Sequence, residues 1–388
     1  LLLGAGMQGR AALHDLVACE VFGEIVAADR DILALKRYAA AYELGERVRC
    51  RHLDAADEAS LDRLIAEGFD VVVDLLPPAL MGRVAAAAVR HGAHVVNTMY
   101  VSPDVRALAG AAAAKGVAIL PEFGMDPGID LVLLGHAVRE FDEVTDILSY
   151  GAGIPEPQAA DNPLRYKVSW TFEGVLRAYR RGALVIRDGA PVQIGPTEQF
   201  LAEHVHEVDV EGVGCLEAYP NGDVLSFLQP LGLDTSRLRH AGRFSMRYPG
   251  HSAFWRTFVA LHLLDDDPVN VDGVAVDRKR FVAAALEPHL QYAEGERDLA
   301  ILRLVVGGNR EGRSVRVVYD VLDRKDLASG LSAMSRLVGF TASVGAQMLA
   351  TGRIIKRGLL SPVTDVPWEP LAQELARRGI SVRRTVTS

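Results

Sequence analysis

The sequence begins with Leu1-Leu-Leu-Gly-Ala-Gly-Met-Gln-Gly-Arg10, which joins a short apolar strand to a helix through a Gly-x-Gly-x-x-Gly pattern. In this pattern the first glycine permits a tight turn, the second lets a pyrophosphate approach the backbone, and the third lets the helix pack close to the strand. Free amide groups at the start of such a helix attract anions. The stretch therefore predicts a dinucleotide-binding turn, with Gly4, Gly6, Met7, Gln8 and Gly9 as cofactor-binding residues. Because the chain opens inside the strand, we expect a short N-terminal piece to precede it.

A second predicted strand, residues 24–29, ends in Asp29, which follows Gly9 by about 20 residues. A carboxylate at this distance typically binds the adenosine ribose hydroxyls. Because it would repel a 2′-phosphate, Asp29 favours NAD over NADP. Arg30, directly beside it, could meet a phosphate or stack on adenine, so NADP stays open as an alternative.

The following residues alternate between apolar strands and helices, which predicts a parallel sheet with helical crossovers, a Rossmann dinucleotide-binding domain over residues 1–125. The predicted strands are residues 69–76, 94–97 and 117–120, and the predicted helices are residues 32–43, 61–67, 80–91 and 104–115. Ligands of such sheets bind beyond the carboxyl ends of the strands. Leu76 and Pro77 are therefore predicted to bind the cofactor, and Tyr100 and Asp126 to lie at the crevice.

Beyond residue 140 the apolar runs give way to short segments with two-residue alternation, which predicts a mostly antiparallel or mixed sheet. We assign residues 126–330 to an α+β substrate and dimerisation domain, and residues 331–388 to a helix and tail that return to the first domain. The expected strands are residues 144–150, 205–213, 215–219, 242–248, 299–306 and 315–321, with a hairpin turn at 307–312, and the expected covering helices are residues 172–180, 254–264 and 278–286. One face of this sheet is expected to stay open and to pair two chains into a homodimer.

Composition excludes several classes of protein. A length of 388 residues predicts about two domains, and a net charge of −8 without a basic run argues against nucleic acid as a partner. The apolar stretch 331–352 carries Arg336 and Gln347, so we interpret it as a packed helix and expect no membrane span. Three widely spaced cysteines form no disulfide or zinc pattern and indicate buried thiols in a reducing cytoplasm. The histidines form no metal-ligand spacing, so no metal is expected.

Five longer segments resemble the saccharopine dehydrogenase family: 98–103 (TMYVSP), 122–130 (EFGMDPGID), 159–170 (AADNPLRYKVSW), 217–223 (EAYPNGD) and 247–250 (RYPG). The chain is most similar to the glutamate-forming branch, often called saccharopine reductase. Residues 173–176 and 185–189 also resemble lysine 6-dehydrogenase, a sister in the same superfamily. The resemblance implies a nicotinamide-dependent enzyme that oxidises, or reversibly reduces, a carbon–nitrogen bond of an amino acid.

The motifs and the resemblance indicate candidate catalytic and substrate-binding residues. Asp126 could hold a substrate ammonium group or act as acid and base, although an Asp before Pro127 is also a good helix N-cap. The resemblance implies that Lys167, Ser169 and Trp170 line the amino-acid site, with Lys167 as a carboxylate partner. The alternatives are a solvated lysine and an ordinary core tryptophan.

Further substrate-binding candidates are Tyr100, Asn221 and Arg247. Saccharopine reductases carry an arginine where Gly222 stands here, and glycine cannot clamp a carboxylate as a guanidinium does. Arg247 could substitute, although an arginine on the solvent face of an alternating strand is the more ordinary interpretation. His251 has a pKa suited to proton transfer, but a lone histidine in a turn is more often incidental.

Three functions therefore compete. The leading hypothesis is an NAD(P)-dependent amino-acid oxidoreductase of the saccharopine dehydrogenase type, with lysine 6-dehydrogenase-like activity as an alternative. A sugar or inositol dehydrogenase is disfavoured, because residues 75–78 read LLPP where those enzymes commonly place Glu-Lys-Pro. The third hypothesis is a catalytically silent NAD-binding sensor or scaffold.

Overall fold

The computed structural model describes residues 1–387, which form two compact units. The first unit comprises Leu1–His136 and Ser335–Ser381, and the second comprises Ala137–Met334 and the residues from Val382 onward. Among the described residues no helix has the length and apolar character needed to cross a membrane.

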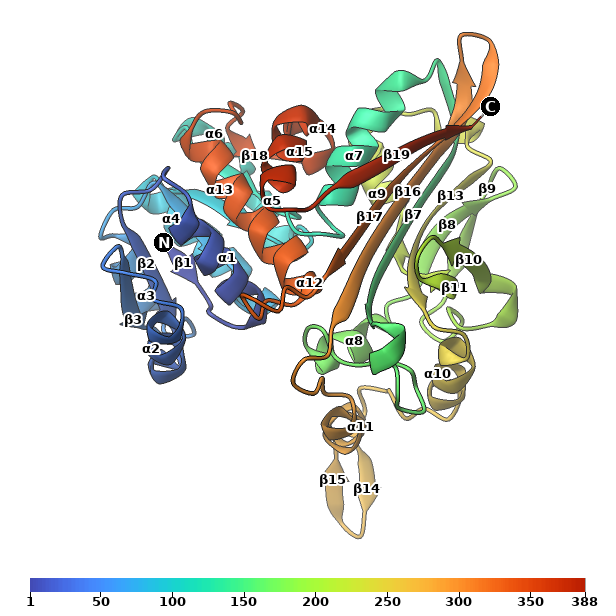
Figure 1. The fold of residues 1–388 in the computed structure, drawn as a ribbon, viewed down its shortest axis with the longest axis horizontal. Helices are drawn as coiled ribbons and strands as arrows, with labels where there is room; N and C mark the ends of the chain where they lie inside the picture. Colours follow the sequence, from blue (N-terminus) through green and yellow to red (C-terminus); the bar gives the residue numbers. More distant parts are fainter. Residues whose placement is uncertain (388) are drawn as a thin grey trace. The chain divides into compact units, whose positions relative to one another are not determined.

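The first unit is built on a parallel sheet with the strand order β18-β6-β5-β4-β1-β2-β3 (Figure 1). This order, with β18 added at one edge, is that of a Rossmann fold, and it confirms the predicted fold class. The strands are β1 (Leu2–Leu3), β2 (Ile25–Asp29), β3 (Val48–His52), β4 (Val71–Asp74), β5 (His94–Asn97), β6 (Ala118–Leu120) and β18 (Gly358–Leu359). Strands β3 and β18 were not predicted from the sequence.

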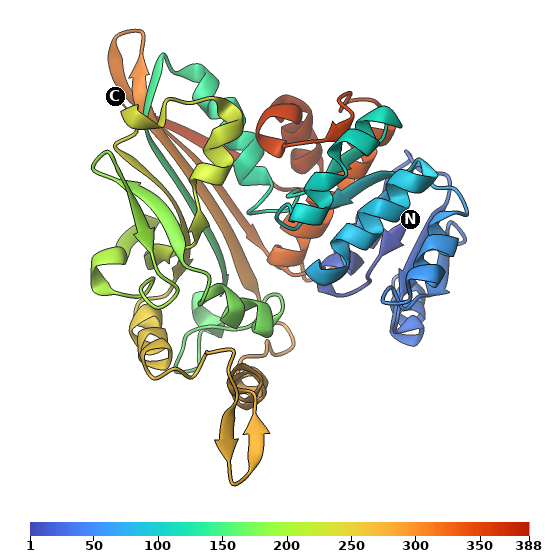
Figure 2. The ribbon, with the colours of Figure 1, turned by 180° about the vertical axis from the view of Figure 1, so that it is seen from behind.

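Helices cover both faces of this sheet. Helices α1 and α13 lie on the face seen in Figure 1, and α4 to α6 lie on the face seen in Figure 2. The helices are α1 (Met7–Ala18), α2 (Ile32–Ala41), α3 (Glu58–Ile65), η1 (Pro78–Leu80), α4 (Met81–His91), α5 (Pro103–Ala107), α6 (Ala109–Ala114), α7 (Ile129–Ala137), η8 (Arg336–Phe340), α13 (Thr341–Ala350), α14 (Pro362–Asp365) and α15 (Trp368–Arg377). Asp57 caps α3 by accepting hydrogen bonds from the Ala59 and Ser60 amides.

Close packing against α1 explains why Gly339 stands in the apolar stretch 331–352. This stretch is not one regular helix, because the π-helical turn η8 precedes α13. A Cβ on Gly339 in η8 would collide with the backbone of α1 at Gln8 and Ala12. Only glycine therefore lets η8 approach the helix that begins at the glycine-rich turn.

The second unit contains a mixed sheet whose main path runs β10-β11-β13-β7-β16-β17-β19. Only β13 and β7 pair in parallel along this path, as the mostly antiparallel prediction requires. The strands are β7 (Glu143–Pro155), β8 (Ala183–Arg187), β9 (Ala190–Ile194), β10 (His206–Val210), β11 (Gly214–Pro220), β12 (Gly222–Asp223), β13 (His240–Arg247), β14 (Val269–Val271), β15 (Val274–Val276), β16 (Asp298–Arg310), β17 (Arg313–Arg324) and β19 (Val382–Thr387).

The three helices predicted to cover this sheet pack together beside β11. Helices α8 (Phe172–Ala178), α10 (His251–Ala260) and α11 (Arg278–Leu286) share a buried aromatic cluster with Tyr219 of β11. Helix α10 packs against β11, and α11 packs against α8. The remaining helical segments are η2 (Val138–Glu140), η3 (Pro157–Ala159), η4 (Ala202–His204), α9 (Leu225–Leu228), η5 (Gln229–Leu231), η6 (Thr235–Arg237), η7 (Glu287–His289) and α12 (Ala333–Ser335).

The other face is not left open, which corrects the expectation of an uncovered apolar sheet. Arg303 of β16 donates a hydrogen bond from Nη1 to the carbonyl oxygen of Asp209 in β10 at 2.6 Å. Four strand spacings separate β10 from β16 along a flat sheet, about 19 Å at 4.8 Å each, so the sheet must curl. Inside the curl, Met246, Ile301 and Leu299 are almost fully buried.

Three further expectations need correction. The hairpin between β16 and β17 turns at Glu311 and Gly312 alone, because β16 continues through the glycines at 307 and 308 to Arg310 and β17 begins at Arg313. The end of the chain does not join the first unit, since β19 pairs with β17. The cysteines are less buried than expected: Cys19 and Cys50 are partly exposed, and Cys215 is exposed.

Candidate functional site

The glycine-rich turn has the shape that a dinucleotide requires. Gly4 adopts φ +87°, and a Cβ there would meet the Leu75 carbonyl oxygen at 2.8 Å. A Cβ on Gly9 would collide with the Gly4 carbonyl, so the helix can approach the turn only without a side chain. Gly6, in contrast, is exposed and has open space in front of it. No side chain caps the start of α1 at Gly6, so its amide groups are available for a pyrophosphate.

Asp29 lies at the carboxyl end of β2 and fixes this turn. Its Oδ2 accepts a hydrogen bond from the Ala5 amide at 2.6 Å, and its Oδ1 accepts one from the Asp31 amide at 2.8 Å. Asp31 in turn caps α2 by accepting from the Ala34 amide. Arg30 is exposed beside this pair of carboxylates. The arrangement holds Asp29 where a ribose could donate to its remaining lone pairs.

Other predicted residues of the first unit follow strand ends. Leu76 is partly buried and Pro77 is exposed, both directly after β4, whereas Tyr100 is partly buried after β5. Met7 is exposed and Gln8 is partly buried at the start of α1. These residues lie at the same, carboxyl edge of the parallel sheet.

Asp126 lies in a tight loop between β6 and α7. Gly124 and Gly128 form a bridge that closes the loop, and the Gly124 amide donates to the Pro127 carbonyl at 2.9 Å. Helix α7 begins only at Ile129, after Pro127 and Gly128. Pro127 is therefore not in the first turn of a helix, and the N-cap interpretation of Asp126 is wrong. Asp126 is partly exposed on this loop.

In the second unit, Lys167 is engaged by two carboxylates. Its amino group lies 2.7 Å from Glu296 and 3.0 Å from Asp161, and its side chain is 5% exposed. Burial lowers the pKa of Lys167, but the hydrogen bonds to Glu296 and Asp161 outweigh this effect and raise it. Lys167 is thus neither a solvated surface charge nor an unoccupied partner for a substrate carboxylate.

Arg247 is a buried cation, which corrects the interpretation of a solvent-facing arginine. Its side chain donates to the Met246 carbonyl at 2.7 Å and lies over the Tyr166 ring at 5.2 Å, while its Nε has no hydrogen-bond partner. The described residues offer it no ion pair with a carboxylate. Burial disfavours the charged form, but Tyr219, Tyr179 and Tyr166 raise the pKa of Arg247, so it stays positive.

His251 lies in the same aromatic cluster and is buried at the start of α10. Its Nε2 is 2.7 Å from the Tyr179 hydroxyl, and its Nδ1 has no partner. Burial, together with Arg247, holds the pKa of His251 well below its usual value. The imidazole is therefore neutral near neutral pH.

The remaining predicted residues surround this cluster. Ser169 is buried, its Oγ has no partner, and it occupies the space that a Cβ on Gly153 would need. Trp170 is partly buried, and its ring packs on Gly174 of α8, as the alternative of a core tryptophan implies. Asn221 donates from Nδ2 to the Ser245 hydroxyl at 3.0 Å.

Gly222, the residue directly after Asn221, has a backbone φ of +85°. This is a conformation that favours glycine.

Sequence reasoning missed two neighbours of Arg247. Arg243 and Ser245 alternate with Arg247 along β13, so the three side chains share one face. Arg243 is buried and lies over the Phe227 ring at 4.5 Å. The spacing Arg-x-Ser-x-Arg places these polar side chains on one face of the strand, but it is equally typical of a solvent-exposed face and so did not reveal that they are buried.

The structure thus brings Arg247, Tyr166 and His251 together within the second unit, and the glycine turn and Asp29 together within the first. Asp126 and Lys167 belong to different units. No group of three or more His, Cys, Asp or Glu side chains in residues 1–387 is arranged to hold a metal ion.

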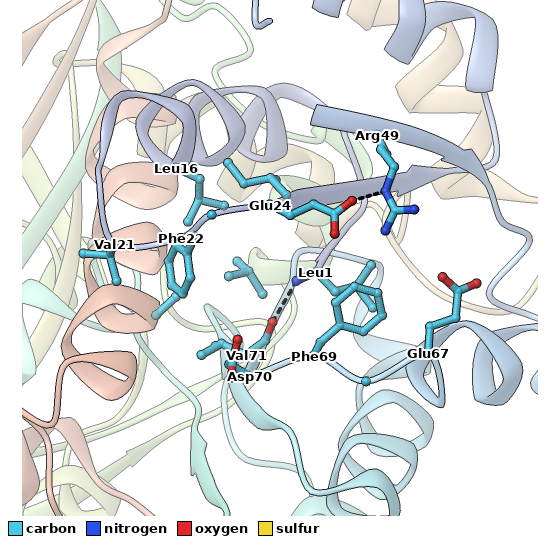
Figure 3. Close-up of a pocket in the computed structure, with 15 residues that line it drawn as sticks. Leu1, Leu16, Val21, Phe22, Glu24, Arg49, Glu67, Phe69, Asp70 and Val71 are labelled. Atoms are coloured by element: carbon cyan, nitrogen blue, oxygen red, sulfur yellow. Dashed lines mark hydrogen bonds and ion pairs between the residues drawn. The ribbon is translucent and has the colours of Figure 1, made fainter. Parts of the chain in front are cut away.

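A cavity of about 270 Å³ lies elsewhere in the first unit (Figure 3). Leu1, Ile25 and Val71 line it, and these residues are at the amino ends of β1, β2 and β4. Glu24 and Arg49 form an ion pair at its wall. Because ligands of parallel sheets bind beyond the carboxyl ends, this cavity is not the candidate site.

Comparisons with known proteins match the chain to two domains of one family. Residues 1–120 match the saccharopine dehydrogenase NADP binding domain, and residues 124–380 match the saccharopine dehydrogenase C-terminal domain.

Two curated relatives are named saccharopine dehydrogenase, NADP(+), L-glutamate-forming. The protein from Pyricularia oryzae is 27% identical over 459 residues, which cover 100% of this chain and 99% of the relative. The protein from Saccharomyces cerevisiae is 26% identical, with 97% and 96% covered. The solved apo structure of the histidine-tagged S. cerevisiae enzyme (L-Glu forming) has the same fold, with a TM-score of 0.87 at 24% identity and coverage of 100% and 99%. Since the two domain matches together span nearly the whole chain, the protein belongs to the saccharopine dehydrogenase family.

Proposed function

We propose that this protein is a nicotinamide-dependent oxidoreductase that acts on a carbon–nitrogen bond of an amino acid. The observation that carries the proposal is the match of both parts of the chain to one family, together with a glycine turn shaped for a dinucleotide. The cofactor supplies the hydride chemistry. The protein must then bind carboxylates, hold the reacting bond in place and handle one proton.

Saccharopine, or a related compound of the lysine pathway, is the substrate that we favour. The names of the relatives from P. oryzae and S. cerevisiae support saccharopine. Gly222 offers no guanidinium, so we expect saccharopine to be a poorer substrate than the family match suggests. Lysine or another diamino acid is therefore a serious competitor.

We assign the carboxylate of the substrate to Arg247, with Ser169 and Asn221 as further polar contacts. A buried guanidinium without a carboxylate partner is costly, and a bound anion would offset that cost. The unpartnered Nε of Arg247 and Oγ of Ser169 support this role. Tyr100 and Trp170 remain proposed substrate contacts, and Lys167 could contribute only if Glu296 or Asp161 gave up its amino group.

Asp126 is proposed as the acid and base near the reacting nitrogen. It lies on the strand-end loop of the first unit, and its backbone is held by the bridge between Gly124 and Gly128. A carboxylate held there could retain a substrate ammonium group and exchange its proton.

For the cofactor we propose NAD over NADP, although the matching domain is described as NADP binding. Asp29 and Asp31 place two carboxylates at the end of β2, where a 2′-phosphate would lie. For the assembly we propose a homodimer. Three cysteines without a disulfide support a reducing compartment such as the cytoplasm.

Replacing Asp126 tests the proposed chemistry. Asp126→Asn removes the titrating group but keeps the size of the side chain, so turnover on the best amino-acid substrate should fall by about two orders of magnitude. NADH binding, measured by fluorescence, should be nearly unchanged. Asp126→Glu is the control, because it restores a carboxylate and should recover part of the rate. Full activity of Asp126→Asn would show that the residue has no catalytic role.

A further inference from the structure

Two buried polar side chains lie next to each other at the carboxyl edge of the first sheet. Asp74 ends β4 and is 4% exposed, and Asn97 ends β5 and is 1% exposed. The two residues are Cα partners in the parallel pairing of these strands, so their side chains point to the same face.

Each side chain uses one oxygen to close the turn that follows its strand. Asp74 Oδ1 accepts from the Leu76 amide, and Asn97 Oδ1 accepts from the Met99 amide, both at 3.1 Å. The Asn97 amide nitrogen has no hydrogen-bond partner. A buried donor without a partner is costly, which indicates that a ligand supplies the missing acceptor.

Turn closure alone does not explain an aspartate at position 74. Burial raises the pKa of Asp74 to about 7, although the hydrogen bond from Leu76 lowers it in part. An uncharged asparagine would accept the same amide bond without that penalty. Retaining a costly group at a strand end is more typical of a binding site than of a structural turn.

The order of the strands indicates which part of a cofactor would reach this pair. The sheet runs β3-β2-β1-β4-β5, with Asp29 at the end of β2 and the glycine turn after β1. If the adenosine ribose meets Asp29 and the pyrophosphate meets the turn, the other half of the dinucleotide extends toward β4 and β5. The glycine turn is close to the end of β4, because a Cβ on Gly4 would lie 2.8 Å from the carbonyl oxygen of Leu75, the residue after Asp74.

We propose that Asp74 and Asn97 together bind the nicotinamide half of the cofactor through its carboxamide or its ribose hydroxyls. The Asn97 amide donates to a carbonyl or hydroxyl oxygen of this half, and the Asp74 carboxyl group accepts an N–H or O–H. This inference rests on the nicotinamide cofactor of the proposed function.

The test compares NADH with ADP-ribose, which lacks the nicotinamide, by titration calorimetry on the full chain. We expect the variants Asn97→Ala and Asp74→Asn each to bind NADH about five- to tenfold more weakly than the wild type, which is the effect of roughly one hydrogen bond. The affinity of both variants for ADP-ribose should differ from that of the wild type by less than about twofold. The control is Asp70→Asn, an exposed carboxylate before the amino end of β4, which should leave both affinities unchanged.

Stability provides a second readout. Asp74→Asn removes a carboxyl group that burial makes costly to ionise, so its free energy of unfolding above pH 7 should not fall below that of the wild type. Weaker NADH binding together with unreduced stability supports a binding role. Unchanged NADH affinity in both variants, or an equal loss for NADH and ADP-ribose, would overturn the inference. If wild-type protein binds NADH but turns over no amino acid, the proposed function fails while this inference stands.

Discussion

Asp29 joins the chemistry of the cofactor site to the shape of the backbone around it. Its two oxygens each accept one amide hydrogen bond, from Ala5 in the glycine turn and from Asp31 before α2. A carboxylate can accept further bonds, so these contacts orient it without saturating it. The negative charge therefore stays available to discriminate between ribose hydroxyls and a 2′-phosphate.

We expect the wild type to bind NADH more tightly than NADPH, and Asp29→Asn to narrow that difference by about tenfold, roughly 1.4 kcal/mol. Asparagine keeps one acceptor oxygen for the Ala5 amide and gives up the bond from the Asp31 amide, so the glycine turn should persist while the charge is lost. Fluorescence titration with both reduced cofactors measures the effect. Tighter NADPH binding by the wild type would refute the preference.

At the scale of residues, sequence reasoning worked where a residue type has one dominant physical reason. Gly4 and Gly9 are required by backbone approach, and their roles could be read directly. The role of Arg247 could not be predicted from the sequence, because alternation along a strand does not tell which face is buried. Asp126 was ambiguous for a similar reason, since Asp before Pro fits both a helix cap and the tight loop observed.

The hairpin that joins β16 to β17 is an element whose turn was misjudged from sequence. The two glycines at 307 and 308 suggested a loop, but Gly308 instead lets β16 pass close to Glu143, where a Cβ would collide with the carbonyl oxygen. The turn itself is Glu311 at φ 53° and Gly312 at φ 74°. Two positive φ angles define a type I′ turn, which prefers Asn followed by Gly.

Glu311→Asn should therefore stabilise the second unit by about 0.5 kcal/mol, because asparagine tolerates the left-handed conformation better than glutamate does. Gly312→Ala should destabilise it by about 1 kcal/mol. Urea denaturation of the two variants measures both effects. Equal stability of Gly312→Ala and wild type would contradict the turn assignment.

The curl of the second sheet was not predictable from its strands. Alternation predicted one face for helices and one for a partner chain, whereas β10 reaches across to β16 and closes that second face. A contact such as that of Arg303 with Asp209 joins residues 94 positions apart, and no local pattern encodes it. The part of that face formed by β10, β11, β13, β7 and β16 is therefore covered by the chain itself.

At the scale of the molecule, a different exposed surface is our proposed contact with a second copy of the chain. The hairpin of β14 and β15 places Val269, Val271, Val274 and Val276 on one face, because directly paired residues point to the same side. Val271 is 51% and Val274 is 63% exposed. A two-stranded hairpin is only marginally stable by itself, so a partner that covers its apolar face would stabilise it.

We expect light scattering to show a dimer at micromolar concentration, and the double variant Val271→Thr, Val274→Thr to shift it toward the monomer. Threonine keeps the shape of valine but makes the face polar. Ala275→Ser, on the opposite face of the same hairpin, is the matched control and should remain dimeric. A monomeric wild-type protein would rule out this assembly.

The family and both fold types could be predicted from sequence, because ordered motifs spread over the chain carry more information than the glycine pattern alone. The substrate could not be predicted, since Gly222 stands where the resemblance to saccharopine reductases implies an arginine that would clamp a substrate carboxylate. Arg247 and its neighbours on β13 provide buried positive charge, but charge alone does not select one amino acid.

The most direct test of the central claim is the rate of NADH or NADPH formation with a panel of amino acids that includes saccharopine, lysine and other diamino acids. We predict oxidation of at least one amino acid that carries a basic or secondary amine, with a rate that depends on Asp126. Binding of the reduced cofactor without turnover of any member of the panel would contradict the assignment as an oxidoreductase and indicate a cofactor-binding sensor instead.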